Sequence, residues 1–313
     1  MEIQIAISVI ICTHNPRHDY LEKVLQALKL QTLPKDLWQL LLIDNASEQT
    51  LSETIDLSWH PQNRCIREER LGLTPARLRG IKEAVANILV FVDDDNVLDK
   101  DYLEVALQIS QDWSSIGAWS GQIRPDFEEQ PPDWVKLYWS MLAIREFDQN
   151  QWSNLRSSTK TTPWGAGLCI RKVVAQKYAE LVYNQPERAI LGRKGNQLMS
   201  CEDNDLALTS CDLGLGTGLF ASLKLTHLIA SHRLQEDHLL RLAQGMGYSH
   251  TILDFFQQGK IPPKQSWAEK LLQYYQNWQM DSRTRRKHLA FQKGVELALT
   301  EIAALRTGLT QLE

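Results

Sequence analysis

The chain has 313 residues, of which 43% are hydrophobic and 23% charged, so it can bury a core in one large domain or two modest ones. Its formal net charge of −4 gives no electrostatic basis for binding nucleic acid, and no stretch approaches the roughly 18 apolar residues of a membrane span. The five cysteines are odd in number and form no CxxC pair, so we expect reduced thiols and a cytoplasmic protein. The apolar start lacks a basic region and a cleavage site, so no signal peptide is expected.

The first half of the chain alternates predicted strands with predicted helices. Apolar, largely β-branched runs predict strands at residues 3–12, 38–43 and 88–92. Helical spacing of apolar residues predicts helices at residues 20–30, about 47–55 and 75–86. Strands that are apolar throughout are typical of sheets covered on both faces. The alternation therefore predicts an α/β fold with a Rossmann-like, mostly parallel central sheet and helices on both faces.

The second half has a less regular pattern. Strands are predicted at residues 116–123, 168–170 and 219–228, helices at 172–182 and 202–213, and helical structure from about residue 234. Proline and acidic residues at 124–134 predict a loop. Six of the ten tryptophans lie between residues 113 and 164, and for any single one of them burial in the core is the expected role.

Three consecutive aspartates, Asp93, Asp94 and Asp95, follow directly on the predicted strand at residues 88–92. Open α/β sheets bind ligands at the carboxyl ends of their strands. Adjacent carboxylates repel one another, so the arrangement favours a bound cation. Oxygen ligands suit Mg²⁺ or Mn²⁺, which commonly hold substrate phosphates. We therefore predict a metal and phosphate site here, in preference to a solvated acidic turn that caps the next helix.

With these pieces in order, the chain resembles the family 2 glycosyltransferases of GT-A fold over roughly residues 5–235. The resemblance is carried by SVIICTHN at residues 8–15, LIDNAS at 42–47, GLTPARLRG at 72–80, FVDDD at 91–95 and EDNDL at 202–206. Each segment alone is a weak signal, whereas their order and spacing together are specific. Pro75 and Leu78 depart from the family pattern, at positions that have no catalytic role in the family.

The resemblance implies a GT-A catalytic domain at residues 1–235, with a nucleotide-sugar-binding half at 1–115 and an acceptor-binding half at 116–235. A helical C-terminal extension at 236–313 is not a general feature of the family. The implied activity is that of an inverting glycosyltransferase. It would move a sugar from a nucleoside diphosphate donor, by default a UDP-sugar, to a hydroxyl of a glycan or lipid-linked acceptor.

The resemblance also implies where a divalent ion binds. Asp95 would hold Mn²⁺ or Mg²⁺ directly, and Asp93 would lie nearer the ribose and the water shell of the metal. His227, after the last predicted strand, resembles the histidine that completes the metal shell in many GT-A enzymes. His232 and His238 compete with it for this role.

The nucleoside would be held by residues at the first two predicted strand ends. By the resemblance, Asp44 accepts a hydrogen bond from the base, most simply from N3–H of uracil. Thr13 and Asn15 would contact the nucleoside through backbone and side chain. Turn formation is the alternative role for all three residues.

The diphosphate is assigned to the predicted helix at residues 75–86. Arg77 matches the family's arginine and would reach the diphosphate, whereas Arg79 lies two positions further on and does not share its face. Asp94 is included in the donor site, although it points to the opposite side of the strand from its neighbours and has a structural role as its alternative.

The acceptor site is assigned to the tryptophan-rich segment and to the second acidic motif. By the resemblance, Asp203 would be the general base, which takes the proton that the acceptor hydroxyl loses as it attacks the anomeric carbon. Glu202 would lie beside it, with N-terminal helix capping as the alternative for this pair. Trp164, Gly165 and Gly167 would form the wall between donor and acceptor, since glycine permits close approach and an aromatic face suits a sugar ring.

Two other functions are weighed against this one. A nucleotidyltransferase shares the sheet and needs metal carboxylates, but it is expected to carry a glycine-rich loop after the first strand. The loop at residues 13–17 contains no glycine. A non-catalytic carbohydrate-binding or assembly protein is a second alternative, against which the acids at positions 93, 95 and 203 argue.

The C-terminal extension carries one amphipathic stripe. It consists of Trp267, Leu271, Leu272, Tyr274, Tyr275 and Trp278 at helical spacing. A basic cluster follows, made of Arg283, Arg285, Arg286 and Lys287. Such a helix can lie on an anionic membrane, here the inner face. Packing on the catalytic domain or on a second subunit in a homodimer is the favoured alternative.

Overall fold

The structure, a computed structural model, describes residues 4–193, 198–259 and 267–309. The chain divides into two compact units. The first consists of Met1–Gln130, Leu142–Ala189 and Glu202–Ile229, and the second of Pro131–Met141, Ile190–Cys201 and Ala230–Glu313. Each unit has a hydrophobic core of its own. No helix in the described part of the chain is long and apolar enough to cross a membrane.

The first unit is built on a single sheet. Its strands are β1 (Ile7–Thr13), β2 (Trp38–Asn45), β3 (Asn63–Glu68), β4 (Ile88–Val92), β5 (Asn96–Leu98), β6 (Ile116–Phe127), β7 (Gln151–Ser153), β8 (Cys169–Arg171) and β9 (Gly216–Ile229). The sheet runs in the order β3-β2-β1-β4-β8-β6-β9-β5, and β7 pairs with β9. The strands β3, β2, β1 and β4 are parallel, and β8 lies antiparallel between β4 and β6. Parallel pairing places the carboxyl ends of β1, β2 and β4 at one edge.

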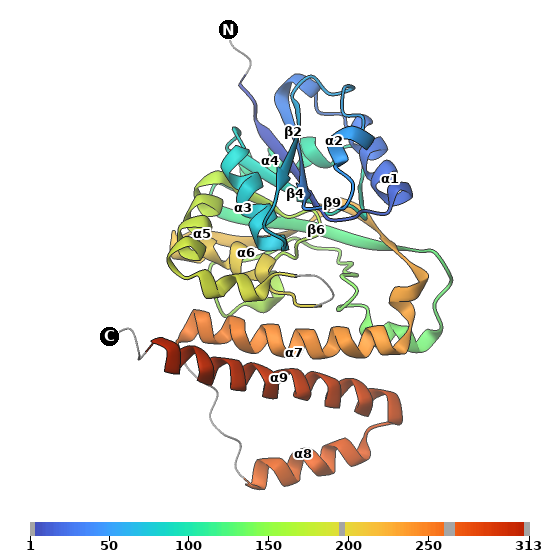
Figure 1. The fold of residues 1–313 in the computed structure, drawn as a ribbon, viewed down its shortest axis with the longest axis vertical. Helices are drawn as coiled ribbons and strands as arrows, with labels where there is room; N and C mark the ends of the chain where they lie inside the picture. The colour runs from blue at the N-terminus through green and yellow to red at the C-terminus, as the bar shows by residue number, and fades with distance from the viewer. Residues whose placement is uncertain (1–3, 194–197, 260–266, 310–313) are drawn as a thin grey trace. The chain divides into compact units, whose positions relative to one another are not determined.

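Helices cover both faces of this sheet (Figure 1). They are α1 (His18–Lys29), α2 (Leu51–Thr54), α3 (Leu73–Glu83), α4 (Tyr102–Asp112), α5 (Lys172–Asn184) and α6 (Glu202–Asp212). Successive side chains of a strand point to opposite faces. In β1, Val9 and Ile11 therefore pack in one core with α1 and α4, whereas Ile10 packs in the other with α3, α5 and α6. This two-sided burial is why the strand is apolar throughout.

The predicted mostly parallel sheet with helices on both faces is confirmed. The loop predicted at residues 124–134 was wrong in its first part, because β6 continues to Phe127, which pairs with Ile229 of β9. The helix expected at about 47–55 is reduced to Leu51–Thr54. The strand β3 was not predicted, since its sequence NRCIRE contains no apolar run and it lies at the edge of the sheet.

The second unit is helical. Its helices are α7 (Glu236–Gln258), α8 (Trp267–Gln279) and α9 (Ser282–Leu309). The helices α7 and α9 pack side by side (Figure 1). A Cβ atom added to Gly294 of α9 would lie 1.9 Å from the carbonyl oxygen of Gln244, and one added to Gly247 of α7 would lie 2.1 Å from that of Phe291. Glycine at these two positions therefore lets the helix backbones approach closely.

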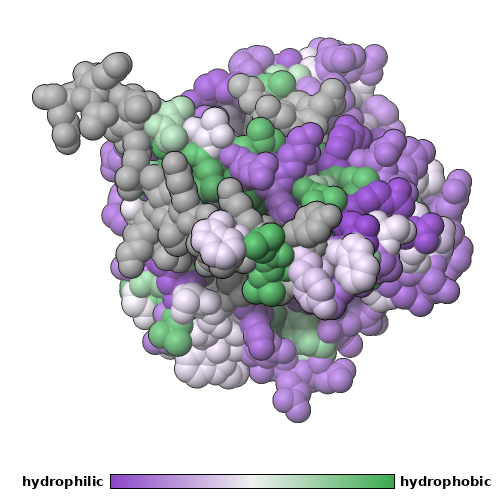
Figure 2. Space-filling view, turned by 90° about the horizontal axis from the view of Figure 1, so that it is seen from below, coloured by the Kyte–Doolittle hydropathy of each residue, from purple (hydrophilic) through white to green (hydrophobic). Residues whose placement is uncertain are grey.

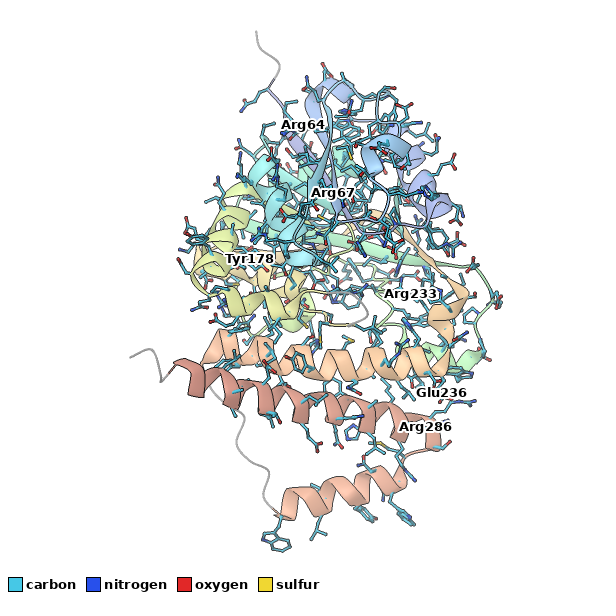
Figure 3. All side chains as sticks on the ribbon, in the orientation of Figure 1. Arg64, Arg67, Tyr178, Arg233, Glu236 and Arg286 are labelled. Atoms are coloured by element: carbon cyan, nitrogen blue, oxygen red, sulfur yellow. The ribbon has the colours of Figure 1, made fainter. Side chains whose placement is uncertain are left out.

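The basic cluster that begins α9 is engaged within the second unit. Arg286 forms a 2.9 Å ion pair with Glu236 of α7 (Figure 3). The guanidinium of Arg283 lies 5.0 Å from the ring centre of Trp134. Arg285 donates hydrogen bonds to carbonyl oxygens at the end of α8 and just after it.

The stripe on α8 is exposed, and Figure 2 shows apolar and aromatic side chains gathered on this face of the molecule. Trp267 is 77% exposed and Trp278 is 68% exposed. Leu271, Leu272 and Tyr275 are also exposed. The side chain of Tyr274 lies outside the described residues.

Candidate functional site

The ends of three parallel strands bring together the residues that the sequence assigned to the donor site. Thr13 is the register partner of Asp44, and β4 pairs with β1 on its other side. The hydroxyl of Thr13 donates a hydrogen bond to the carboxylate of Asp94. Burial, together with the charge of Asp95, raises the pKa of Asp94 to about 7. Asp94 is therefore tied to the end of β1 by this hydrogen bond, and its place in the donor site stays a prediction.

The loops after β1 and β2 are joined through Asn15. Its backbone N–H donates to Ser47 Oγ at 3.0 Å, and its side-chain oxygen accepts from Glu48 N–H at 2.9 Å. Its φ of +48° lies in the left-handed region, which asparagine tolerates better than most residues. These contacts give Asn15 a structural role in shaping the loops. Its contact with the nucleoside stays a prediction.

Asp44 is buried, with only 1% of its side chain exposed. Its carboxylate accepts hydrogen bonds from Ser47 N–H at 3.0 Å and Leu51 N–H at 3.2 Å, and it pairs with Arg67 at 2.9 Å. Burial alone would raise the pKa of Asp44, but these hydrogen bonds hold it below its ordinary value. The carboxylate therefore shapes the loop after β2 and is charged, whereas the predicted contact with the base stays a prediction.

Arg77 of α3 is buried and forms an ion pair with the buried carboxylate of Glu202 at the start of α6. Tyr178 of α5 donates a 3.3 Å hydrogen bond to the other carboxylate oxygen of Glu202. Arg77 also lies 3.8 Å from Asp93. Arg79, by contrast, pairs with Glu83 on its own helix. The structure thus separates the two arginines as predicted, and it links Arg77 directly to both acidic motifs.

The charges of this cluster depend on one another. Burial would lower the pKa of Arg77, but Glu202, Asp93 and Asp203 raise it above its ordinary value. Burial raises the pKa of Glu202 to about 7, against the opposing effect of Arg77. One guanidinium thus faces three carboxylates. A site with this excess of negative charge favours a bound cation.

Asp203 lies beside the segment Trp164–Gly167. Its carboxylate accepts a hydrogen bond from the backbone N–H of Gly165. A Cβ atom at Gly165 would lie 2.8 Å from the guanidinium of Arg77 and 3.2 Å from the carboxylate of Asp203, so a side chain there would separate the two. Gly167 has a φ of +67°, and its carbonyl oxygen accepts a 2.6 Å hydrogen bond from Tyr102. Glycine at these two positions is therefore explained by the local structure. The predicted contacts of both glycines with the acceptor stay predictions.

Arg145 is a site residue that the sequence did not reveal. Its guanidinium carbon lies 3.4 Å from the ring centre of Trp164, and it donates a 3.0 Å hydrogen bond to the carbonyl oxygen of Thr162. Burial lowers the pKa of Arg145 to about 10, although the nearby charge of Asp203 opposes this effect. No motif surrounds Arg145 in the sequence, so only the folded chain shows its place beside the predicted base.

Asp95 and His227 meet where β5 pairs with β9. The Asp95 carboxylate lies 3.2 Å from Nε2 of His227, and Nδ1 lies 3.0 Å from the carbonyl oxygen of Leu142. Because a carbonyl oxygen only accepts, Nδ1 is the protonated nitrogen. A neutral ring would then turn a lone pair on Nε2 toward a carboxylate. A metal cation bound between them would accept this lone pair and the carboxylate oxygen together, so the pair fits a divalent ion.

The described residues offer at most part of a shell for a metal ion. Among the described residues, no group of three or more histidine, cysteine, aspartate or glutamate side chains is placed to hold a metal ion. Asp95 and His227 would therefore share the ion with phosphate oxygens and water, as is usual for ions that bind nucleotides. The competing His232 and His238 belong to the second unit, where their ring centres lie 6.0 Å apart.

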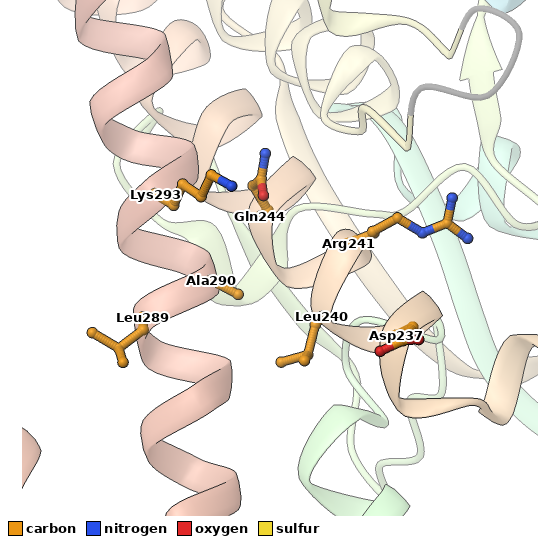
Figure 4. A pocket seen from close by; sticks show the side chains of 7 residues that line it. All are labelled: Asp237, Leu240, Arg241, Gln244, Leu289, Ala290 and Lys293. Atoms are coloured by element: carbon orange, nitrogen blue, oxygen red, sulfur yellow. The ribbon is translucent and has the colours of Figure 1, made fainter.

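A cavity of about 490 Å³ lies between α7 and α9 in the second unit (Figure 4). It is lined by Asp237, Leu240, Arg241, Gln244, Leu289, Ala290 and Lys293. None of these residues belongs to the predicted site.

Comparisons with known proteins identify the family of the first part of the chain. Residues 8–173 match the family model described as Glycosyl transferase family 2. Glycosyltransferase AglE of Haloferax volcanii is 30% identical over 101 residues, which is 31% of this chain and 33% of AglE. The match thus spans only about a third of the length of that curated relative.

Solved structures show the same fold. The crystal structure of residues 1–349 of S. aureus TarS in complex with UDP-GlcNAc aligns with 97% of this chain and 92% of that chain, with a TM-score of 0.52 and 15% identity. The structure titled S. aureus TarS aligns with 95% of this chain and 54% of that chain, with a TM-score of 0.52 and 16% identity. The mostly parallel sheet and its flanking helices are those of the GT-A fold.

Proposed function

Because the chain belongs to glycosyl transferase family 2, we propose that it transfers a sugar from a UDP-sugar to an acceptor hydroxyl with inversion at the anomeric carbon. The observation that carries this proposal is the convergence of Asp93, the Asp95–His227 pair and Asp203 around the end of β4. Uridine is favoured as the base because TarS, whose fold this chain shares, was crystallised with UDP and with UDP-GlcNAc.

The proposed donor site lies at the carboxyl ends of β1, β2 and β4. Asp95 and His227 would hold a divalent ion, and Asp93 would lie within reach of its water shell and the ribose. An imidazole nitrogen among the ligands favours Mn²⁺, because Mg²⁺ is usually bound through carboxylates, phosphates and water. When bound, the ion neutralises the charge that develops on the departing diphosphate.

Arg77 would contribute to the donor site by positioning its carboxylates. Its ion pair with Glu202 fixes the guanidinium between the two acidic motifs, 3.8 Å from Asp93. This position places a positive charge beside the carboxylates that bind the donor. We therefore assign Arg77 to positioning the metal carboxylates and Asp203, and its direct contact with the diphosphate stays a prediction.

The proposed base is Asp203. It is partly exposed, and the N–H of Gly165 and the N–H of Asn204 each donate to one of its carboxylate oxygens. As the acceptor oxygen forms its bond to the anomeric carbon, Asp203 takes the hydroxyl proton. The bond from that carbon to the diphosphate breaks, and its electron pair leaves with UDP. This single displacement inverts the configuration of the sugar.

A nucleotidyltransferase remains the second enzymatic alternative. The loop at residues 13–17 argues against it, since Asn15 and the backbone around it bond to the neighbouring loop instead of forming a glycine-rich cradle for a triphosphate. A non-catalytic binding protein is a third alternative. A buried Arg77–Glu202 pair costs desolvation energy, and an enzyme has more reason than a binding scaffold to keep such a pair beside a base.

The deciding experiment is a screen of nucleotide sugars for hydrolysis without acceptor, with Mn²⁺, with Mg²⁺ and with a chelator. We expect metal-dependent release of UDP from one UDP-sugar, and we expect the Asp95→Ala variant not to release it. Thermal unfolding in parallel should show stabilisation by UDP only when the metal is present. Stabilisation by a nucleoside triphosphate, with none by UDP, would instead favour the nucleotidyltransferase.

A further inference from the structure

Arg145 is a cationic side chain beside the proposed base that forms no ion pair with any described residue. Its contacts there are the stacking on Trp164 and the hydrogen bond to the carbonyl oxygen of Thr162. Asp203 is close enough to influence it electrostatically but makes no hydrogen bond with it. A guanidinium carries five N–H donors, so most of its capacity is unused by the described part of the chain.

Arg145 lacks the acidic partner that most buried or partly buried arginines of the first unit have: Arg77 pairs with Glu202, Arg188 with Asp205 and Arg67 with Asp44. Arg171 also has no acidic partner, but it donates to three backbone carbonyl oxygens, whereas Arg145 donates to one. Removing a charge from water without a counter-charge is unfavourable. Stacking on Trp164 fixes the plane of the guanidinium but does not neutralise it. The site therefore carries a preformed positive group oriented by an aromatic ring.

The position of Arg145 indicates which substrate it meets. Trp164 directly precedes Gly165, whose N–H binds the carboxylate of Asp203. Arg145, Trp164 and Asp203 are all partly exposed, so a ligand in contact with the base can reach the guanidinium. The acidic residues assigned to the donor, Asp93 and Asp95, have their own cationic or imidazole neighbours in Arg77 and His227.

We propose that Arg145, held on Trp164, binds an anionic group of the acceptor, a carboxylate or a phosphate close to the hydroxyl that is glycosylated. This inference rests on the proposed function, in which Asp203 faces the acceptor. A guanidinium matches the two oxygens of either group with two parallel N–H donors. The acceptor is thus an acidic sugar or a phosphate-bearing chain, and neutral glycans of the same shape bind less tightly.

The test uses two pairs of small probes that differ in charge: methyl β-glucuronide against methyl β-glucoside, and glycerol 3-phosphate against glycerol. Binding is measured by ligand-observed NMR with protein saturated with UDP and Mg²⁺, which is diamagnetic. We expect the wild type to bind the anionic member of at least one pair roughly tenfold more tightly, which corresponds to about 1.4 kcal/mol. Arg145→Gln should abolish this preference.

The control is Arg64→Gln, which removes an arginine of β3 that pairs with Glu83 (Figure 3). It should keep the preference. Arg145→Lys keeps the charge but loses the planar fork, so a reduced preference is expected, and it serves as the variant if Arg145→Gln does not fold. Thermal unfolding of each variant reports folding.

Three results would overturn the proposal: no preference for the anion in the wild type, an unchanged preference in Arg145→Gln, or competition between the anion and UDP. The last would place Arg145 at the donor diphosphate instead of the acceptor. The same titrations without UDP separate this inference from the proposed function. The protein could bind no UDP and still show an anion preference that depends on Arg145. That result would reject UDP-sugar as the donor and would support the anion site at Arg145.

Discussion

The carboxylate of Asp95 lies 3.2 Å from the imidazole of His227, although 132 positions separate the two residues in the chain. The contact arises because Asn96, the first residue of β5, is the register partner of His227 in β9. The carbonyl oxygen of Leu142 holds the opposite ring nitrogen and so fixes the direction of Nε2. Two groups that both tend to accept protons are thereby held face to face, which is the arrangement that a shared cation stabilises.

The Asp95→Ala variant should therefore lose metal-dependent binding of UDP while the fold survives. Asp95 is partly exposed after a strand end, so its removal leaves the core intact. Calorimetric titration with UDP, with and without Mn²⁺, measures the effect. Asp112→Ala, at the exposed end of α4, is the matched control and should bind as the wild type does. Unchanged Mn²⁺-dependent binding in Asp95→Ala would remove the metal role from this residue.

The Asp203→Asn variant should bind UDP and metal almost normally but turn over roughly 10²–10⁴-fold more slowly, the usual contribution of a positioned general base. Asparagine keeps the size of the side chain, and its oxygen can still accept the N–H of Gly165. Turnover is measured with saturating donor, and Asn204→Ala is the neighbouring control. A variant that loses affinity for UDP and keeps its turnover would move Asp203 to the donor site.

The Glu202→Gln variant should be markedly less stable, by about 3–5 kcal/mol, because it leaves the buried charge of Arg77 without its closest partner. Helix capping by an exposed charge, the alternative role that the sequence left open, would contribute only about 0.3–1 kcal/mol. Chemical denaturation measures the difference. Glu180→Gln, whose partner Lys177 is exposed, should cost less than about 1 kcal/mol. Similar losses in both variants would mean that the Arg77–Glu202 pair is not buried.

Because of His60, the free energy of unfolding should decrease as the pH falls into the mildly acidic range. Its side chain is buried against Trp38, with ring centres 4.0 Å apart, and burial together with Lys35 lowers the pKa of His60 to about 4. Between this value and the ordinary 6.5, the unfolded chain binds a proton that the folded protein does not. The stability that depends on neutral His60 is thus fully present above pH 6.5, and it is lost as the pH drops toward 4.

The measurement is thermal unfolding at pH 7.5 and pH 4.5. His60→Asn should show a smaller loss between the two values than the wild type, by at most about 3 kcal/mol at about 1.4 kcal/mol per pKa unit. An equal loss in both proteins would show that other groups cause the acid sensitivity.

The exposed stripe on α8 should be covered by a second copy of the chain. Aromatic residues with few charges are typical of the buried centre of protein interfaces. The basic residues that an anionic membrane would attract are already engaged, Arg286 by Glu236 and Arg283 by Trp134. Light scattering should therefore give the mass of a dimer, and the double variant Leu271→Glu/Trp278→Glu should give a monomer. A monomeric wild type that sediments with anionic vesicles at low salt would support membrane contact instead.

The sequence by itself determined the class of fold and most of the candidate residues. Five apolar residues followed by three aspartates identify a buried strand and predict the chemistry at its end, because side-chain alternation and strand-end position are properties of contiguous residues. The resemblance to the family added the glycines at 165 and 167 and the acids at 202 and 203, whose roles stay predictions. Their local patterns resemble those of the family that the comparison with residues 8–173 confirmed.

Only the tertiary structure decided which of these residues act on one another. The ion pair of Arg77 with Glu202 joins positions 125 apart, and the register of β5 against β9 selects His227 as the partner of Asp95. Arg145 acquires its place on Trp164 through folding alone, since its own neighbours in the sequence form no motif. Pairings of this kind depend on strand order and on the crossing of helices, which bring together residues that share no local pattern. Charge and burial, and hence the pKa of each group, are set by those neighbours in space.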